Sequence, residues 1–289
     1  MPTLKEFNKK LVSLRNTRKM TKTMKMVSAT KFHRALEAQR TGRQFEEEWR
    51  RCVARLALAG DAEGHPLVTP RTPPSSAMVV VVSSDRGLCG SFNNGLHRAV
   101  VAWMAANAGR YQRLDVSCCG HQAFAYFRSR MPVRRHYEGV TARPNFAEAS
   151  KIGAEFVSLF LDRRYDEVFV AYNRCLNALS QKPVVERLLP IEWEAGGAAA
   201  PGLRADILFE PGHKEVMELL LPRTVMLKLF FVLVENAVGE HGARMTAMDS
   251  ATQNADRMIR HYALRRNRAR QASITKEMIE IVTGAEALK

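Results

Sequence analysis

Apolar and small residues recur in alternating steps of three and four along the C-terminal part of the chain. From Pro222 to Leu288 there is no further proline, which favours one unbroken helix about 100 Å long. A globular core helix is the alternative, but such helices average about 11–12 residues. The narrow stripe is instead typical of a coiled coil. Its positions are Leu227, Phe230, Val234, Ala237, Met248, Ala251, Ala255, Met258, Tyr262, Ala269, Ala272 and Ile279.

Residues 3–58 predict a second long helix. Thr3 is an acceptable N-cap, with Glu6 placed three residues later as in a capping box. One stripe consists of Leu4, Phe7, Leu11 and Leu14, and a second one, about 150° round the helix, of Thr17, Met20, Met24 and Val27. A single straight seam does not serve both stripes, so we expect this helix to change partners near residues 15–20.

The middle of the chain has a different pattern. Residues 61–76 contain four prolines and no periodicity, which predicts a linker. The continuous apolar run at 77–84 is typical of a strand buried on both faces. Further strands are expected at 113–120, 166–173, 182–191 and 205–212, with helices at 92–108, 121–130 and 146–162. This alternation predicts an α/β domain with a mainly parallel sheet; the prolines near both ends of 182–191 make it an edge strand.

The predicted fold class is therefore α/β. Two long terminal helices form an antiparallel coiled coil, and a Rossmann-like α/β domain is inserted between them. The expected divisions are an N-terminal helix at 1–60, a linker at 61–76, the α/β domain at 77–212 and a C-terminal helix at 213–289.

The chain is strongly basic, with a formal charge of +15. Such a charge usually indicates an acidic partner, namely nucleic acid, anionic lipid or an acidic protein surface, although a solvated basic helix face is the simpler alternative. No apolar run approaches the ~20 residues of a membrane span, and the N-terminus lacks the apolar core of a signal peptide. Five cysteines without a CxxC pair predict free thiols in a reducing cytoplasm.

The segment at 83–92 (SSDRGLCGSF) follows a buried strand and opens a helix, where a phosphate-binding loop would lie. It has neither the GxGxxG pattern nor the lysine of a P-loop. We therefore interpret it as a tight turn that does not bind nucleotide. Gly87 and Gly90 would supply backbone freedom, and Asp85 and Ser91 would be cap or turn residues.

Other reactive side chains form no diagnostic group. Cys118 and Cys119 are adjacent in a predicted strand, which favours a place in the core over a nucleophilic role. His241 falls on the C-terminal stripe, where a packed histidine is more usual than a ligand. No other His, Asp and Glu residues have metal-ligand spacing. The sequence thus predicts no catalytic site, no metal site and no cofactor.

Four arginines surround the C-terminal helix near its end. This arginine girdle (Arg265, Arg266, Arg268 and Arg270) occupies angles of about 0°, 100°, 300° and 140° on a helical wheel. A helix that reads a DNA groove would gather its basic residues on one side. The girdle therefore favours a rod with partners on several sides, with ordinary solvation as the alternative.

Five segments together resemble the gamma subunit of the F-type ATP synthase. They are LRNTRKMTKTMKMVSATK (14–31), SDRGLCGSFN (84–93), YNRCLNALSQKPVVERLLPI (172–191), EHGARMTAMDSATQNADRMI (240–259) and NRARQASITKEMIEIVTGAEAL (267–288). They occur in order over essentially the whole chain, and the last is the most specific.

The resemblance implies a central rotor shaft that couples ion flow through the membrane c ring to ATP synthesis or hydrolysis. Its implied partners are three alpha and three beta subunits, the epsilon subunit and the c ring, at the cytoplasmic face of the bacterial inner membrane. It implies no catalytic site, no nucleic acid and no direct small-molecule substrate. The implied subunit contacts, with the girdle included, are Met24, Lys25, Met26, Arg266, Arg268, Arg270, Gln271, Thr275 and Glu280.

The sequence departs from the family pattern in places. Gly239 and Gly242 stand where small helix formers are usual, and Arg266 stands where a tyrosine commonly precedes the asparagine. We expect Gly242 to allow close contact with the partner helix and Gly239 to be a compliant point. A basic coiled-coil protein that binds nucleic acid is the alternative function, although the basic stretches lack interleaved aromatic residues for base stacking.

Overall fold

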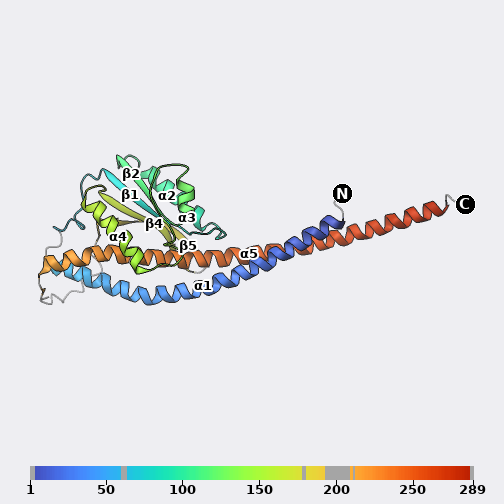
Figure 1. Ribbon diagram of the computed structural model, residues 1–289, viewed down its shortest axis with the longest axis horizontal. Helices are drawn as coiled ribbons and strands as arrows, with labels where there is room; N and C mark the ends of the chain where they lie inside the picture. The colour runs from blue at the N-terminus through green and yellow to red at the C-terminus, as the bar shows by residue number, and fades with distance from the viewer. Residues whose placement is uncertain (1–3, 60–63, 178–179, 193–208, 211, 287–289) are drawn as a thin grey trace. The chain divides into compact units, whose positions relative to one another are not determined.

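The computed structural model describes residues 4–59, 64–177, 180–192, 209–210 and 212–286 (Figure 1). The two longest elements are the helices α1 (Leu4–Ala59) and α5 (His213–Glu286). The expected N-cap Thr3, the loop at 193–202 and most of the expected strand at 205–212 lie outside the described residues.

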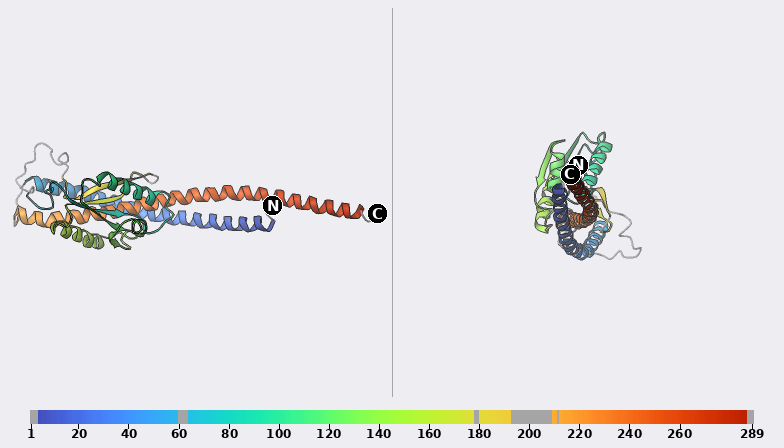
Figure 2. Two further views of the ribbon diagram at one scale, coloured as in Figure 1. Left: turned by 90° about the horizontal axis from the view of Figure 1, so that it is seen from above. Right: turned by 90° about the vertical axis from the view of Figure 1, so that its right-hand side faces the viewer.

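The chain divides into two compact units. One contains residues 1–28 and 244–289, and the other contains residues 29–243. Both long helices contribute to both units, and in each unit they run antiparallel (Figures 1 and 2). The coiled-coil prediction is therefore confirmed. The predicted boundaries at 60, 76 and 212 separate consecutive segments of the sequence and not compact units. These boundaries stay a prediction.

The larger unit contains a five-stranded sheet in the order β3-β2-β1-β4-β5. The strands are β1 (Ser76–Val82), β2 (Arg113–Cys119), β3 (Val133–Tyr137), β4 (Glu167–Cys175) and β5 (Gln181–Leu189). The first four are parallel, and Val79 on β1 pairs with both Val116 and Phe169. β5 is the antiparallel edge strand that its prolines predicted.

The strand β3 was not predicted. Its sequence, VRRHY, is short, and three of its five residues are basic or histidine. It lies at the edge of the sheet, where only β2 pairs with it, so it lacks the long apolar run of a central strand.

Helices cover both faces of the sheet (Figures 1 and 2). They are α2 (Phe92–Asn107), α3 (His121–Phe127) and α4 (Phe146–Leu161). Side chains alternate along β1: Met78, Val80 and Val82 pack with α4, α5 and α1. Ala77, Val79 and Val81 pack instead with α2 and α3. Burial on both faces explains the unbroken apolar run of β1.

The helix α5 begins at His213 and contains Pro222 in its interior. An interior proline removes one backbone hydrogen bond and usually kinks a helix, at a cost of about 3 kcal/mol. Here the preceding turns are fixed by burial, because Met217 and Leu221 both lie in the core beneath the sheet. Tertiary packing therefore continues the helix through a residue that local preference reads as a boundary.

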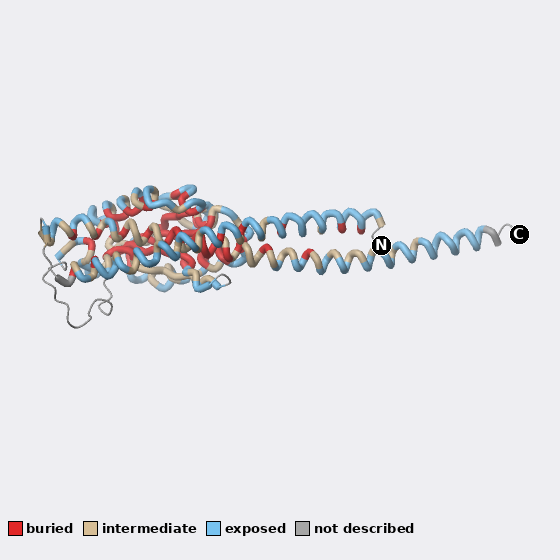
Figure 3. Tube along the Cα trace, turned by 90° about the horizontal axis from the view of Figure 1, so that it is seen from below, coloured by how far each residue is buried: buried red, intermediate tan, exposed pale blue. Residues whose placement is uncertain are grey.

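α1 keeps α5 as its partner beyond residue 20, where Thr21 meets Thr252 and Lys25 pairs with Asp249. The expected change of partners near residues 15–20 is therefore wrong within the chain. The buried residues of this seam follow one another in steps of four or seven, with one longer step: Phe7, Leu11, Thr21, Ser28 and Phe32 (Figure 3). The stripe residues Met20 and Val27 are exposed. The small polar residues Thr21 and Ser28 continue the seam, and Met20 and Val27 of the second stripe stay open to partners outside the chain.

Gly239 packs against the sheet domain, so the expectation of a compliant point there is wrong. A Cβ atom added at Gly239 would lie 3.0 Å from Cε2 of the buried Phe92. The expected close contact of Gly242 with the partner helix stays a prediction.

Gly239→Ala should therefore lower the thermal unfolding temperature of the chain, because the Phe92 ring must move to admit the methyl group. Gly95→Ala is the matched control: Gly95 also lies in a helix, but its Cβ position has open space. That change should instead stabilise by about 0.5–1 kcal/mol through helix propensity. Stabilisation by both changes would contradict the contact.

Candidate subunit-contact surface

The smaller unit is a two-helix coiled coil with few apolar contacts. Phe7 and Tyr262 lie with ring centroids 6.4 Å apart, and Leu11 is buried. Between the helices, the Thr252 hydroxyl donates to the Thr21 hydroxyl at 2.8 Å. A seam that includes hydroxyl pairs makes a narrow and only moderately apolar interface, since each such bond contributes about 1 kcal/mol.

Ion pairs flank this seam and use one of the predicted contact residues. Arg18 pairs with Asp256 at 3.0 Å, and Lys25 pairs with Asp249 at 2.6 Å. Both pairs are partly exposed, so each contributes about 0–1 kcal/mol. Lys25 therefore helps to fix the register of the helices. Of its neighbours, Met24 is half-buried and Met26 is exposed.

The arginine girdle is largely open to solvent. Arg265, Arg268 and Arg270 are exposed, and no described residue forms an ion pair with them. Arg266 is half-buried and donates from Nη2 to Asn267 Oδ1 at 3.0 Å. The guanidinium N–H groups of the girdle therefore form no ion pair with an acidic side chain among the described residues.

The remaining predicted contact residues also lie on exposed helix surface. The Thr275 hydroxyl donates to the Gln271 carbonyl at 2.9 Å, as is usual within a helix. Glu280 pairs with Lys276 at 3.5 Å. Because Lys25 lies beside Asp249, the segments 24–26 and 266–280 are separated by about 25–45 Å along α5. The structure therefore places the predicted contact residues in two separate segments and does not bring them together.

The last turns of α5 carry an apolar surface that the heptad analysis misassigned. The heptad spacing predicts that Ala269, Ala272 and Ile279 lie in the seam between the two helices. The described part of α1 begins at Leu4, and near that end Phe7 contacts Tyr262. The helix α5 continues past this point without α1 beside it (Figure 1). The exposed apolar side chains there are Leu264, Ile274, Met278, Ile279, Ile281 and Val282.

The turn after β1 is fixed by hydrogen bonds that Asp85 accepts from neighbouring segments of the sheet domain. Asp85 accepts from the His121 backbone N–H at 3.1 Å and from the Thr141 hydroxyl at 2.8 Å. Left-handed backbone occurs at Leu88 and Gly90, not at Gly87 as expected. Asp85 thus joins this turn to α3 and to the segment before α4, which agrees with a structural role.

The helix α5 fills the place where such a sheet usually binds a ligand. In doubly wound sheets, ligands bind at the carboxyl ends of the strands where the strand order reverses. Here that point lies between β1 and β4. The Asn236 amide of α5 donates to the Ser83 carbonyl at the end of β1, at 3.1 Å. This contact supports the interpretation that the turn does not bind nucleotide.

The predicted core cysteines are confirmed. Cys118 and Cys119 are fully buried in β2, and burial raises the pKa of Cys118 to about 12. All five cysteines are free thiols. Within the described residues, no group of three or more His, Cys, Asp or Glu side chains is placed to hold a metal ion. No described helix has the length and apolarity needed to cross a membrane.

His97 is a buried histidine that the sequence analysis did not single out. It stacks on Tyr126 with ring centroids 4.5 Å apart, and neither ring nitrogen has a hydrogen-bond partner among the described residues. Burial lowers its pKa to about 4, and Arg130 adds to the effect. The group is a neutral core residue of the α2–α3 face of the sheet.

Acid should destabilise the chain through His97. The unfolded chain binds this proton near pH 6.5 and the folded chain only near pH 4, so stability falls as the pH drops between these values. Urea unfolding at pH 7 and pH 5 should show a contribution of about 2 kcal/mol that His97→Leu removes. His121→Leu, at an exposed position of α3, should keep the parent difference. An unchanged difference in His97→Leu would contradict the prediction.

The fold defines a class of protein: two long helices that pair antiparallel, with an α/β domain inserted between them in the sequence. A sequence model of the family described as ATP synthase matches residues 3–288. The ATP synthase gamma chain of Anaeromyxobacter sp. (strain K) is 44% identical over 293 residues and that of Geobacter sp. (strain M21) 38% over 289, each comparison covering 100% of both chains. This chain belongs to the ATP synthase gamma chain family.

Solved structures show the same fold. One chain is from the Euglena gracilis mitochondrial ATP synthase, OSCP/F1/c-ring in rotational state 3. It aligns with a TM-score of 0.67 at 18% identity, covering 99% of this chain and 94% of that one. A chain of the Tetrahymena thermophila mitochondrial ATP synthase central stalk and c-ring aligns with a TM-score of 0.61 at 22% identity, covering 80% and 99%. As a member of the ATP synthase gamma chain family, the chain is a component of an enzyme complex.

Proposed function

We propose that this chain is the central rotor shaft of an F-type ATP synthase. It transmits rotation between a membrane c ring driven by ion flow and a catalytic head of three alpha and three beta subunits. The full-length relationship to ATP synthase gamma chains carries the proposal. The exposed apolar and basic end of α5 supports it, because this surface fits partners that surround a helix.

The chain itself is non-catalytic in this proposal. Nucleotide chemistry belongs to the head, and this subunit changes the conformation of the head as it turns. The complex lies at the cytoplasmic face of a bacterial inner membrane, with the c ring and the epsilon subunit as further partners. The bacterial origin of the related gamma chains supports this location.

Two surfaces are proposed to meet the head. The segment at Met24 and Met26 offers flexible apolar side chains that adapt to a changing neighbour. The segment at 266–280 offers the arginine girdle together with Gln271, Thr275 and Glu280. Contacts with exposed charges are individually weak, at about 0–1 kcal/mol, which suits a surface whose partner changes during each turn.

Co-purification tests this function against the nucleic-acid alternative, for which the comparisons give no support. The tagged chain should retain alpha and beta subunits through a high-salt wash, because apolar contacts persist when charges are screened. In parallel, binding to duplex DNA should be weak and should disappear as salt rises. Salt-resistant DNA binding, with no alpha or beta subunit retained, would overturn the proposal.

A further inference from the structure

The contact between α5 and the sheet is built around a buried polar residue. Asn236 is fully buried, and its neighbours Val232, Leu233, Ala237 and Val238 are buried as well. Apolar contacts are non-directional, so on their own they do not determine the rotation of a helix about its axis. A buried amide has to find a partner or lose about 1–3 kcal/mol. The bond from Asn236 to the Ser83 carbonyl therefore selects one rotation of α5.

Ser83 joins this bond to the rest of the sheet domain. Its backbone N–H donates to the Cys119 carbonyl at 2.9 Å. Its hydroxyl accepts from the backbone N–H of Ala123, in the first turn of α3, at 2.8 Å. One fully buried serine thus connects α5 with β1, β2 and α3.

Two further residues on the same side of α5 make contacts beside this bond. Glu235 accepts from the Cys175 backbone N–H, at the end of β4, at 3.0 Å. Gly239 packs against Phe92, and the Phe92 carbonyl in turn accepts from Asn173 Nδ2 at 3.0 Å. Positions 235, 236 and 239 lie within about 100° of one another on the helix. They meet the ends of β4 and β1 and the start of α2.

We propose that Glu235, Asn236 and Gly239 form an anchor that fixes the rotation of α5 against the sheet domain. Torque applied to the sheet domain then reaches α5 without the helix rolling about its own axis. Asn236 is the positioning residue of this anchor: a roll by one residue, about 100°, would move its amide away from Ser83. The inference rests on the proposed rotor function and names the place where the sheet domain and the helix are coupled.

Asn236→Leu in the assembled complex tests the anchor. The change keeps the side-chain size and removes the donor to the Ser83 carbonyl. The complex should still assemble and hydrolyse ATP. Ion-driven ATP synthesis and the torsional stiffness of the rotor, measured by single-molecule rotation, should both fall. We expect rolled states of α5 to become roughly tenfold more populated, which corresponds to about 1.4 kcal/mol.

Asn107→Leu is the matched control. Asn107 also donates from its amide to a backbone carbonyl, that of Trp103 at 2.8 Å, but within its own helix α2. This variant should keep the parent stiffness and synthesis. Parent values in Asn236→Leu, or an equal fall in both variants, would overturn the anchor. If Asn236→Leu does not assemble, Gly239→Ala decides by the same readouts. A parent chain that fails to assemble with alpha and beta subunits would overturn the rotor function instead.

Discussion

Gly120→Ala should lower the free energy of unfolding by about 3 kcal/mol, the largest stability effect expected for a single methyl group in this chain. Gly120 precedes α3 with φ +93° and ψ 145°, a conformation essentially restricted to glycine. An added Cβ atom would also lie 2.7 Å from the Ser83 carbonyl oxygen. That oxygen belongs to buried backbone at the carboxyl edge of the sheet, so it cannot turn away as a flexible side chain would.

Gly139→Ala separates the backbone strain of a positive φ from the steric clash of an added Cβ atom. Gly139 has φ +73°, but open space surrounds its Cβ position, so this change should cost only the backbone strain, about 1 kcal/mol. Urea unfolding of both purified variants measures the difference. Equal losses would show that the close approach of Gly120 to Ser83 does not matter for stability. Loss of ion-driven synthesis in Gly120→Ala, beyond its loss of stability, would further connect Ser83 to the anchor.

Replacing Arg266, Arg268 and Arg270 together by glutamine should leave the complex assembled but lower ATP synthesis more than ATP hydrolysis. The girdle lies mostly outside the helix seam, and Arg268 and Arg270 are exposed. At about 0.5 kcal/mol for each contact, the triple change removes about 1.5 kcal/mol of coupling, or roughly tenfold in synthesis rate at most. Raising the ionic strength should reproduce the effect in the parent, because exposed contacts are screened by salt.

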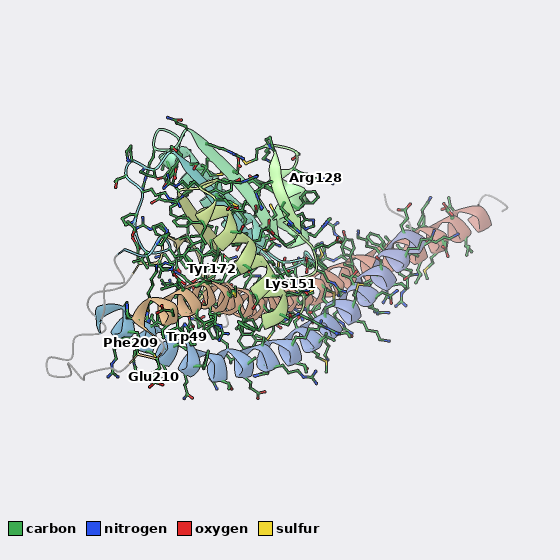
Figure 4. All side chains as sticks on the ribbon, turned by 60° about the vertical axis from the view of Figure 1, so that its left-hand side comes forward. Trp49, Arg128, Lys151, Tyr172, Phe209 and Glu210 are labelled. Atoms are coloured by element: carbon green, nitrogen blue, oxygen red, sulfur yellow. The ribbon has the colours of Figure 1, made fainter. Side chains whose placement is uncertain are left out.

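The control for this experiment removes the same charge elsewhere. Arg98, Arg128 and Arg143 are exposed arginines of the sheet domain; Figure 4 labels Arg128. Their triple replacement by glutamine changes the net charge equally and should leave the ratio of synthesis to hydrolysis at the parent value. The girdle is not a coupling element if its triple variant fails to assemble, if it synthesises ATP at the parent rate, or if both triple variants behave alike.

The sequence predicts an element correctly where the local pattern of residues matches the way the element is buried. A heptad stripe needs only the periodicity of one helix, and the valine run from Val79 to Val82 needs only a strand buried on both faces. Both features depend on residues close in sequence, so the long helices and the central strand could be predicted. The edge position of β5 followed in the same way from its prolines. The resemblance of whole segments added the family, which periodicity alone does not identify.

The sequence could not show which helix residues lie in the seam and which are exposed, because this depends on where each helix ends relative to the other. Ile279 has the spacing of a seam residue, but α1 does not extend to it, so the same pattern marks an exposed surface. Thr21 and Ser28 have no apolar signal, and yet they fill the seam, because a narrow two-helix contact admits small polar side chains. Whether a periodic residue faces its partner helix or solvent is decided by the length and register of the other helix.

Sequence alone determined the helical rod, the inserted parallel sheet and the family of this chain, because these are written in periodicity and in contiguous motifs. Tertiary structure alone decided the edge strand β3, the helix through Pro222 and the packing of Gly239 against Phe92. It also decided that Asn236, a polar residue in an apolar turn, meets the Ser83 carbonyl. These features join residues that are distant in the chain, and no local pattern specifies which distant group will lie within hydrogen-bond or van der Waals distance.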